Sequence, residues 1–341
     1  MPYYLGIDGG GTKTTCAVGD DLRLLATATA GGSNIVRAGE LQARESLHQS
    51  VRQACAAAGI TLTQVARTCV GGSGAARPEL AAIVRSILAE ILSSPIDVLG
   101  DMEIALEAAF DAGPGVIVIA GTGSIAYGRN HHGNTARAGG WGFAIGDEGS
   151  AHWIGRTAVN AVLRASDPRD GTVDSRVPHV SPPLRGMGFQ DTGVSSSQNS
   201  ALAVALCKSW GVVSLSDLAR AANSIPPPDF AALFPAVAAS EDGLAQQVLS
   251  NAGRELAQIA ALISRRLFPA DETESVPVAM IPVAMIGSVF RHAVVTRENF
   301  YNELRRLDPR AEISSAVVDP VEGALKMARR QRGADTPVRR G

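Results

Sequence analysis

Residues 3–18 read YYLGIDGGGTKTTCAV, in which an apolar run stops at Asp8, three glycines follow, and a second β-prone run begins. This pattern predicts a strand, a tight turn and a second strand. Glycine has no Cβ atom, so backbone N–H groups in the turn can hold a phosphate, while Thr12 adds a hydroxyl and Asp8 a carboxylate for a magnesium ion or its water shell. Taken alone, the stretch fits a plain glycine hairpin equally well. Its spacing matches neither the GxGxxG nor the GxxxxGK motif.

A second unit of the same kind lies further along the chain. Residues 116–120 are strongly apolar, residues 121–124 read GTGS, and residues 125–129 resume as a strand. The turn offers backbone donors and two hydroxyls to nucleotide phosphates or to a phosphoryl acceptor. The repetition predicts two related domains whose phosphate turns face each other, with a boundary near Gly113-Pro114-Gly115.

Strands and helices alternate in the rest of the chain, which predicts mixed sheets covered by helices. Further strands are expected at 22–28, 65–70, 96–99 and 283–286, and helices at 40–58, 78–92, 104–110, 151–163, within 201–268, at 296–306 and at 321–330. The motif PVAMI occurs twice, at 277–281 and 282–286, and the sequence leaves open which copy lies in a sheet. Residues 168–200 are expected to form a surface excursion and residues 333–341 a disordered tail.

The composition excludes several classes of protein. The chain has 341 residues, of which 45% are hydrophobic and 19% charged, as in ordinary soluble domains, and its length favours two of them. A net charge of -2 gives no electrostatic signal for nucleic acid or for an anionic membrane. No apolar run reaches a membrane span and no signal peptide is evident, so a cytoplasmic protein is expected. The four cysteines lack CxxC spacing and are expected to be buried thiols: Cys16, Cys55, Cys69 and Cys207.

Two further features carry chemistry. Asp101 follows a short predicted strand and precedes a helix, a position from which a carboxylate can point into a cleft, although helix capping is the favoured reading on position alone. Residues 139–150 read GGWGFAIGDEGS and include five glycines, which implies a backbone bent around something. Core packing by Trp141 and capping of the next helix by Asp147 or Glu148 explain these residues singly, but not the glycines.

Four motifs together resemble the N-acetylglucosamine kinase and BadF/BadG-type ATPase family, within the superfamily of sugar kinases, heat-shock ATPases and actin. They are GIDGGGTKT at 6–14, GTGS at 121–124, GGWGFAIGDEGSAHWIG at 139–155 and PVEGALKMA at 320–328. The resemblance runs from residue 3 to about residue 330. It implies an α/β fold of two actin-like (ribonuclease H-like) domains, each a mixed sheet with helices, around an ATP/sugar cleft. Residues 1–114 would form the first domain, with a helix at about 318–332 returning to it, and residues 115–317 the second, with a helical insertion.

The resemblance also implies roles for single residues. ATP would be bound by Gly10, Gly11, Thr12, Lys13, Thr122, Gly123 and Gly287, with Asp8 near the magnesium ion. The sugar would be bound by Asn34, Ser73, Asp101, Ser124, Gly140, Trp141 and Asp147. Asp101 would be the base that accepts the proton of the sugar 6-hydroxyl. One departure is that Gly287 is followed by Ser288 where such kinases carry a glycine pair, which leaves the adenine contacts open.

The function implied is ATP-dependent phosphorylation of the 6-hydroxyl of an amino sugar, with N-acetylglucosamine first, glucosamine second and N-acetylmuramic acid third. Two other classes share the fold. A dehydratase-activating ATPase holds an iron–sulfur cluster through cysteines, whereas the cysteines here fall in predicted strands and helices. A non-catalytic ATP/sugar-binding regulator that acts on DNA needs a DNA-binding domain, whereas this chain begins at its first strand. The resemblance alone suggests a homodimer.

Overall fold

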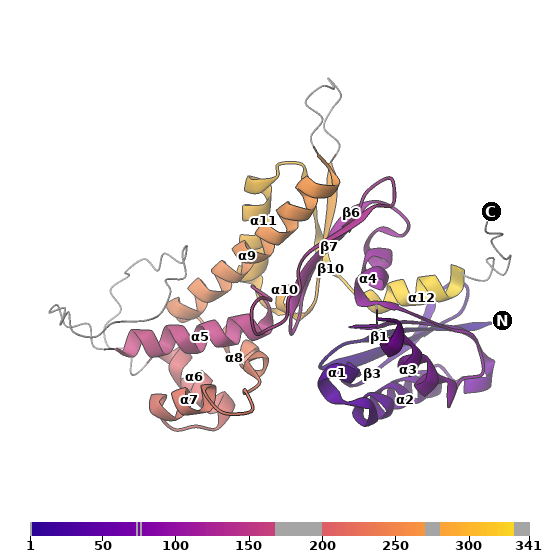
Figure 1. The fold of residues 1–341 in the computed structure, drawn as a ribbon, viewed down its shortest axis with the longest axis horizontal. Helices are drawn as coiled ribbons and strands as arrows, with labels where there is room; N and C mark the ends of the chain where they lie inside the picture. Colours follow the sequence, from indigo (N-terminus) through magenta and orange to yellow (C-terminus); the bar gives the residue numbers. More distant parts are fainter. Residues whose placement is uncertain (1, 73, 76, 168–199, 270–279, 331–341) are drawn as a thin grey trace, which may run out of the picture.

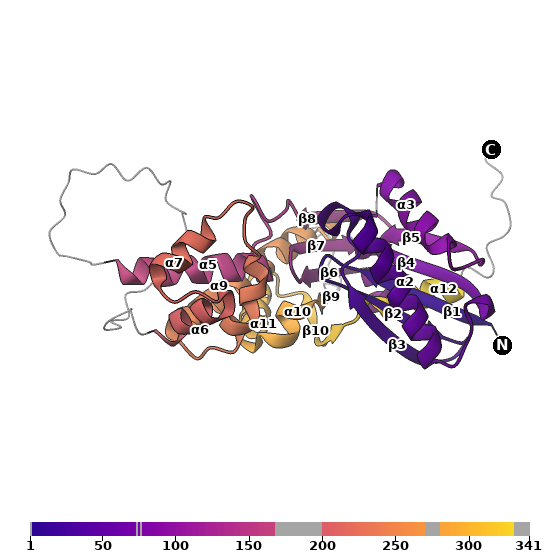
Figure 2. The ribbon, with the colours of Figure 1, turned by 90° about the horizontal axis from the view of Figure 1, so that it is seen from below.

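The computed structural model describes residues 2–72, 74–75, 77–167, 200–269 and 280–330. Its architecture consists of two five-stranded sheets with helices around each (Figures 1 and 2). Ser73, most of the expected excursion at 168–200, the first three residues of the first PVAMI copy and the expected tail at 333–341 lie outside the described residues. Among the residues that the structure describes, no single helix is long and apolar enough to cross a membrane. The helices α6 (Ala201–Trp210) and α7 (Leu215–Ala222) reach that length and apolarity only together, as a pair bent by 54°.

The first sheet has the order β3-β2-β1-β4-β5. Its strands are β1 (Tyr3–Gly9), β2 (Lys13–Gly19), β3 (Leu24–Gly31), β4 (Val65–Gly72) and β5 (Ile96–Gly100). The first three form an antiparallel meander, and β4 and β5 run parallel to β1. Because the carboxyl ends of parallel strands meet at one edge, the chain just after β1, β4 and β5 lies along the same edge of the sheet.

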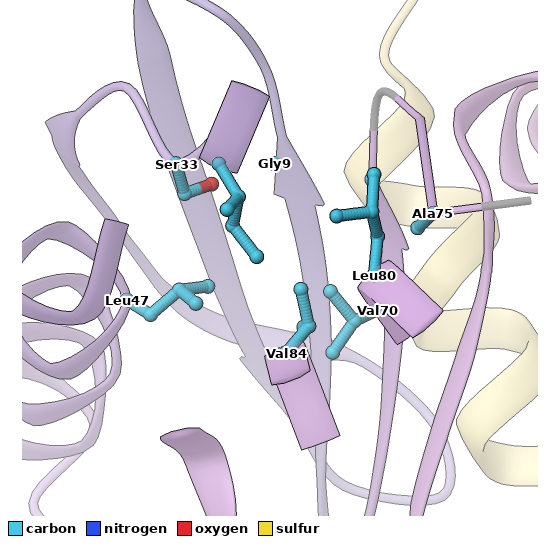
Figure 3. A pocket seen from close by; sticks show the side chains of 9 residues that line it. Gly9, Ser33, Leu47, Val70, Ala75, Leu80 and Val84 are labelled. Carbon is cyan, nitrogen blue, oxygen red and sulfur yellow. The ribbon is translucent and has the colours of Figure 1, made fainter. Parts of the chain in front are cut away.

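Alternation along β1 explains how both faces of this sheet are covered. Leu5 and Ile7 pack towards α2 (Glu40–Ala57) and α3 (Pro78–Ala89), whereas Tyr4 packs on the other side with α4 (Asp101–Phe110) and α12 (Pro320–Arg330). Short α1 (Ile35–Ala38) and η1 (Leu62–Gln64) complete this part. A small pocket remains between α2, α3 and the sheet, at the end of the strands near Gly9 (Figure 3).

The second sheet repeats this topology in the order β10-β9-β6-β7-β8. Its strands are β6 (Gly115–Ala120), β7 (Ser124–Arg129), β8 (Thr135–Gly139), β9 (Ile281–Ile286) and β10 (Ala311–Val318). Here β6, β7 and β8 form an antiparallel meander, and β9 and β10 run parallel to β6. Strand β9 begins at Ile281, the last residue of the first PVAMI copy, and then contains the whole second copy, so the second copy occupies the sheet.

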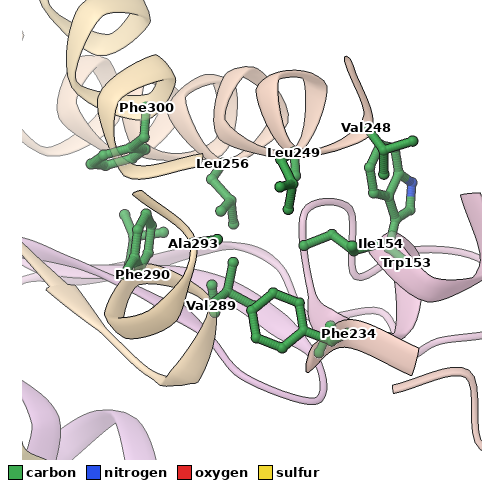
Figure 4. Packing of buried hydrophobic residues seen from close by; sticks show 14 of the residues in the cluster. Trp153, Ile154, Phe234, Val248, Leu249, Leu256, Val289, Phe290, Ala293 and Phe300 are labelled. Atoms are coloured by element: carbon green, nitrogen blue, oxygen red, sulfur yellow. The ribbon is translucent and has the colours of Figure 1, made fainter. Parts of the chain in front are cut away.

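The helices around the second sheet build the largest core, part of which Figure 4 shows. They are α5 (Ala151–Ser166), α6, α7, η3 (Phe230–Leu233), α8 (Phe234–Ala238), α9 (Gly243–Leu267), α10 (Ser288–His292) and α11 (Val294–Leu307). Long α9 buries residues at helical spacing, such as Ala245, Leu249, Ala252 and Leu256. Phe290 and Phe300 pack edge to face in the same core, with ring centroids 5.0 Å apart.

After β10 the chain crosses back, and α12 lies against β1 and α4 of the first sheet (Figure 1). Gly323 permits this contact, because a Cβ atom there would meet the carbonyl oxygen of Ile104 and lie 2.6 Å from the amide nitrogen of Ala108. The division of the chain into domains at residue 114 stays a prediction. Of the cysteines, Cys16, Cys55 and Cys69 are buried as expected, whereas Cys207 is only partly buried.

Candidate active site

The two glycine turns meet. The turn between β1 and β2 and the turn between β6 and β7 are joined by a 2.8 Å hydrogen bond between the hydroxyls of Thr12 and Thr122, which are 110 residues apart in sequence. Within the turns, the Gly10 N–H donates to the Lys13 carbonyl and the Gly121 N–H to the Gly123 carbonyl, both at 2.9 Å. The Gly10 N–H is therefore used inside its own turn. The N–H groups at the tips of the two turns are better placed than that of Gly10 to bind a phosphate.

Gly287 lies directly behind the second turn. It precedes α10 with a φ of 104°, and a Cβ atom there would meet the carbonyl of Ala120 and lie 3.1 Å from the Gly121 nitrogen. Both the positive φ and this close approach require glycine. The structure therefore brings together Gly287 and the second turn, two of the predicted ATP-binding segments, although the contacts with ATP stay a prediction.

Asp8 lies near the end of β1, close to the first turn. Burial raises the pKa of its carboxyl to about 7, the charges of Asp101 and Asp319 add to this, and Lys13 opposes it. A cation beside such a carboxylate would be stabilised, and magnesium is commonly held by one or two carboxylates together with phosphate oxygens. No group of three or more His, Cys, Asp or Glu side chains in the described ranges forms a metal cage. The donor chemistry at Asp8 nevertheless fits the magnesium ion of a nucleotide.

Asp101 is the first residue of α4 and follows β5 directly. The N-cap of α4 is Gly100, which makes no side-chain capping bond, so Asp101 does not cap the helix as its position suggested. Its Oδ1 accepts a 3.0 Å hydrogen bond from the N–H of the next residue, Met102. Burial nonetheless raises the pKa of Asp101 to about 6, against the lowering effect of the backbone N–H groups of Met102 and Asp101. A partly buried carboxylate whose charge is felt by Asp8 is a candidate for proton transfer.

The segment 139–150 wraps around the second turn. Asp147 is 8% exposed and has a φ of 60°, rare for a residue other than glycine. Its Oδ1 accepts a 3.3 Å hydrogen bond from the Gly142 N–H, and its Oδ2 lies so close to Gly123 that a Cβ atom there would be only 2.7 Å away. Burial raises the pKa of the Asp147 carboxyl. The unusual backbone conformation of Asp147 thus places its carboxylate in close contact with Gly123 in the turn between β6 and β7.

Both simple explanations of this segment are wrong. Ser150, not Asp147 or Glu148, caps α5, since its Oγ accepts a 3.1 Å hydrogen bond from the Trp153 N–H. Trp141 is not packed in the core: it is 67% exposed and stacks with the guanidinium of Arg137, 5.4 Å from the ring centroid. The glycines are explained by backbone geometry, because Gly139, Gly140, Gly142 and Gly149 all have positive φ.

The other predicted sugar-binding residues differ in how their side chains are used. Ser124 is buried and its hydroxyl donates to the Glu148 carbonyl at 2.7 Å, which ties the turn to the segment 139–150. The Oδ1 of Asn34 caps α1 by accepting from the N–H groups of Val36 and Arg37 at 3.0 and 3.3 Å. Its side-chain amide group thus remains as a donor for a ligand. Sugar contacts by these residues stay predictions.

Sequence reasoning missed a contact between the two halves of the site. The guanidinium of Arg37 lies 3.5 Å from Asp229 Oδ1, and its Cδ would be 3.5 Å from a Cβ atom on Gly11. Nearby, the His152 ring packs against Phe143 in a tilted arrangement and against Phe230 edge to face, at centroid distances of 5.0 and 5.3 Å. No local pattern signals this pairing, because Arg37 and Asp229 are 192 residues apart.

Comparison with known proteins gives two curated relatives. Over 171 residues the chain is 39% identical to the N-acetylmuramic acid/N-acetylglucosamine kinase of Clostridium acetobutylicum, a match that covers 50% of this chain and 56% of that protein. Over 175 residues it is 35% identical to the N-acetyl-D-glucosamine kinase of Dictyostelium discoideum, covering 48% and 55%. The chain therefore spans about half the length of the curated relatives it matches.

The fold is matched over a much longer stretch. A solved structure assigned as an N-acetylglucosamine kinase, from Chromobacterium violaceum, superposes with a TM-score of 0.64 and 25% identity, covering 96% of this chain and 99% of that one. This likeness and the two matching sheets confirm the expected fold class of two actin-like α/β units. The family model for BadF/BadG/BcrA/BcrD ATPases matches residues 5–328, which confirms the resemblance seen in the motifs. The protein therefore belongs to the BadF/BadG/BcrA/BcrD ATPase family.

Proposed function

We propose that the protein is an ATP-dependent sugar kinase that phosphorylates the 6-hydroxyl of N-acetylglucosamine. The observation that carries the proposal is the hydrogen bond between Thr12 and Thr122, which joins two phosphate-type turns beside the carboxylates of Asp8 and Asp101. Two glycine turns that could bind phosphates, with raised-pKa carboxylates near the first of them, would be suited to transferring a phosphoryl group to a hydroxyl. The two curated relatives and the Chromobacterium violaceum structure are each named as kinases of N-acetylated amino sugars, and these names support the same class of acceptor.

The proposed roles rest on the family resemblance and are compatible with the geometry of the site. The N–H groups of the turn tips, the hydroxyls of Thr12 and Thr122 and the ammonium of Lys13 would hold the phosphates, and Gly287 would let the second turn approach them. Asp101 would orient the 6-hydroxyl towards the γ-phosphorus and accept its proton late in the transfer. Magnesium bound beside Asp8 would neutralise charge on the phosphates. Most of the catalysis would then come from positioning and charge neutralisation.

The sugar would lie between the segment after β3 and the segment 139–150. Asn34 would donate its amide N–H, Asp147 would accept from sugar hydroxyls, and the exposed ring of Trp141 would offer an apolar face. Gly140 and Ser124 would line the same site, with Ser124 acting through the turn that its hydroxyl secures. A cytoplasmic homodimer belongs to the same proposal and is drawn from the family resemblance.

The proposal is tested by coupled ADP release from ATP and magnesium, with N-acetylglucosamine, N-acetylmuramic acid, glucosamine and glucose as acceptors. N-acetylglucosamine is expected to stimulate ADP release, and the product is expected to carry phosphate at the 6-position by NMR. Preference for N-acetylmuramic acid, favoured by the name of the Clostridium relative, would change the acceptor but keep the kinase. If no sugar stimulates ADP release, the site serves another acceptor or a non-catalytic partner, and the kinase proposal fails.

Asp147→Asn is expected to raise the KM for the sugar about 10–100-fold with little change in kcat at saturating sugar, because a carboxylate acceptor is lost in the ground state and the transition state alike. Asparagine tolerates the positive φ of this position, so the backbone is expected to hold. Steady-state kinetics in both substrates measure the effect. Glu148→Gln is the matched control, since it removes the adjacent charge, and a similar KM change in it would contradict a specific role for Asp147.

The pH dependence of turnover provides a separate check on Asp101. A base must be ionised, so activity is expected to be full well above the raised pKa of about 6 and to fall as the pH drops through that value. Below it, kcat/KM for the sugar is expected to decrease about tenfold per pH unit. The profile is measured with magnesium held saturating at each pH. A rate that stays flat down to pH 5 would exclude Asp101 as the titrating base.

A further inference from the structure

Arg37 lies against the glycine turn between β1 and β2, which is proposed to hold the phosphates of ATP. A Cβ atom added to Gly11 in that turn would lie 3.5 Å from the Arg37 Cδ and 3.7 Å from its Nη1. Lys13, at the end of the same turn, opposes the rise in the pKa of Asp8 that burial causes, so its charge is felt at that carboxylate. Arg37 is therefore a second cation beside the turn, with no part in the roles proposed for Lys13.

Backbone hydrogen bonds hold Arg37 in this place. The N–H groups of Ser33 and Asn34 donate to the Gly10 carbonyl at 3.0 and 3.3 Å, which joins the segment after β3 to the turn. The Arg37 N–H in turn donates to the carbonyl of Asn34 at 3.1 Å and to its Oδ1 at 3.3 Å. Arg37 thus sits on backbone that is bonded to the turn, and its distance from the turn does not depend on its side chain alone.

The charge of Arg37 also reaches the start of α5, which adjoins the turn between β6 and β7. The His152 N–H donates to the Thr122 carbonyl in that turn at 3.4 Å. Burial lowers the pKa of the His152 ring, and the charge of Arg156 adds to this. Asp229 opposes the shift, and Arg37 lowers the pKa further. Arg37 therefore lies between the two turns, where the phosphates are proposed to bind.

The ion pair of Arg37 uses little of its hydrogen-bonding capacity. In the described parts of the chain, its guanidinium has one ion-pair partner, Asp229, at 3.5 Å from Nη2 to Oδ1. Charge-assisted hydrogen bonds are usually about 2.7–2.9 Å long, so this contact is a loose one. The two side chains are 42% and 53% exposed, and such a pair adds little to stability. Most of the N–H donors of the guanidinium are therefore available to a ligand.

We propose that Arg37 is a phosphate-binding residue of the transfer reaction, whose guanidinium donates to oxygens of the transferring phosphoryl group. Its planar fork matches two phosphate oxygens, and its charge counts most in the transition state, where negative charge spreads over that group. The inference rests on the proposed kinase activity. The sugar 6-oxygen bonds to the γ-phosphorus as the bond to the ADP oxygen breaks, the sugar proton goes to Asp101, and Arg37 forms no covalent bond.

The first test compares Arg37→Gln with Arg23→Gln. Arg37→Gln is expected to lower kcat by about 10²–10³-fold, with the KM for the sugar within about 3-fold of that of the unmodified protein. Arg37→Lys keeps the charge but loses the fork, and is expected to recover at least about 10-fold of the loss. Arg23→Gln is the matched control, because Arg23 is an exposed arginine beside an aspartate, Asp20, at the other end of β2. Its kcat is expected to change less than about 2-fold.

Chemical rescue gives a readout that a structural role would not move. The Arg37 side chain is 42% exposed, so its removal in Arg37→Ala leaves a space that opens to solvent. Millimolar guanidinium ions are expected to raise the kcat of Arg37→Ala at least about 10-fold, because they restore the donors that face the phosphoryl group. Ammonium at the same ionic strength is the control for salt. The unmodified protein is expected to show no gain with either ion.

A clasp between the two halves of the site is the competing role for Arg37. Asp229→Asn breaks the ion pair but keeps an oxygen for the Ala231 N–H, which donates to Asp229 Oδ1 at 3.1 Å. This variant is expected to change kcat less than about 3-fold, since the partner of the guanidinium in the reaction is the phosphoryl group. A loss in Asp229→Asn as large as that in Arg37→Gln would overturn the proposal. So would recovery of kcat when Arg37→Asp is combined with Asp229→Arg.

Nucleotide binding without sugar separates this inference from the kinase proposal. With magnesium and a non-hydrolysable ATP analogue, calorimetry is expected to show about 10-fold weaker binding to Arg37→Gln, and a smaller change for ADP. If that difference is found and is absent in Arg23→Gln, but no sugar is phosphorylated, the arginine site stands and the kinase proposal fails. If a sugar is phosphorylated and Arg37→Gln behaves as Arg23→Gln does, the kinase stands and the inference fails.

Discussion

Replacing Asp101 by asparagine is expected to lower kcat by about 10²–10⁴-fold while leaving the affinity for the sugar within a few-fold of that of the unmodified protein. Asparagine keeps an oxygen at the position that accepts the Met102 N–H, so the start of α4 is expected to keep its local hydrogen bond. It cannot take a proton at neutral pH. The loss should therefore fall on the chemical step, and it is measured by ADP release at saturating sugar together with calorimetric binding of the sugar.

The same substitution should stabilise the fold. The pKa of Asp101 is raised from 3.8 to about 6 in the folded protein, chiefly by burial, so the folded state binds the proton more tightly than the unfolded state. Stability is therefore lost as the pH rises from about 4 to about 6 and stays lower above that range. Removing the charge is expected to recover about 1–3 kcal/mol in the free energy of unfolding at pH 8. Higher stability with lower activity would mark a group retained for function.

Glu103→Gln is the matched control for Asp101. It removes a carboxylate from the same first turn of α4, where the side chain of Glu103 is exposed. A loss of kcat in this variant as large as that in Asp101→Asn would show that the effect comes from the charge at the start of α4 in general and is not specific to Asp101. An unchanged kcat in Asp101→Asn would remove the proposed base, whatever the fate of the sugar-kinase proposal as a whole.

The hairpins were predictable because their signal is local. A glycine turn between two apolar, β-prone runs occurs at residues 3–18 and again at residues 116–129, and the structure places both at equivalent points of its two sheets. Strands β8 and β10 were missed, and both are edge strands of the second sheet. Much of β10 is exposed, and its sequence AEISSAVV lacks a continuous apolar run. An edge strand needs only one paired side, so its pattern is weak.

The candidate site was only partly predictable from the sequence. Glycines at 121–123 and 139–149 signalled unusual backbone, and the structure joins the two segments through Asp147 and Ser124. Sequence could not show that Trp141 is exposed, because a tryptophan is compatible with a core or a ligand face. Nor could it reveal the pairing of Arg37 with Asp229, since that contact depends on how two distant segments are folded together.

Gly323→Ala is expected to lower the free energy of unfolding by about 2–4 kcal/mol, although alanine is the better helix former by about 1 kcal/mol. The added methyl would meet the backbone of α4 at Ile104 and Ala108, and backbone atoms cannot rotate away as a flexible side chain can. Either α12 must move as a unit or α4 must bend. The effect is measured as a shift of the urea midpoint followed by circular dichroism.

The displacement should also reduce turnover, because α4 begins with Asp101 and α12 lies on β1, which carries Asp8. A shift of about 1 Å in a reacting group can cost about 10²-fold in rate, so a loss of about 10-fold or more in kcat is expected even where the variant remains folded. Gly243→Ala is the matched control: it lies in the first turn of α9 with nothing within 4 Å of an added Cβ atom, and no loss of stability is expected. If Gly323→Ala unfolds at the same urea concentration as the unmodified protein, the two helices are not in backbone contact, and α12 cannot be what holds Asp8 and Asp101 in register.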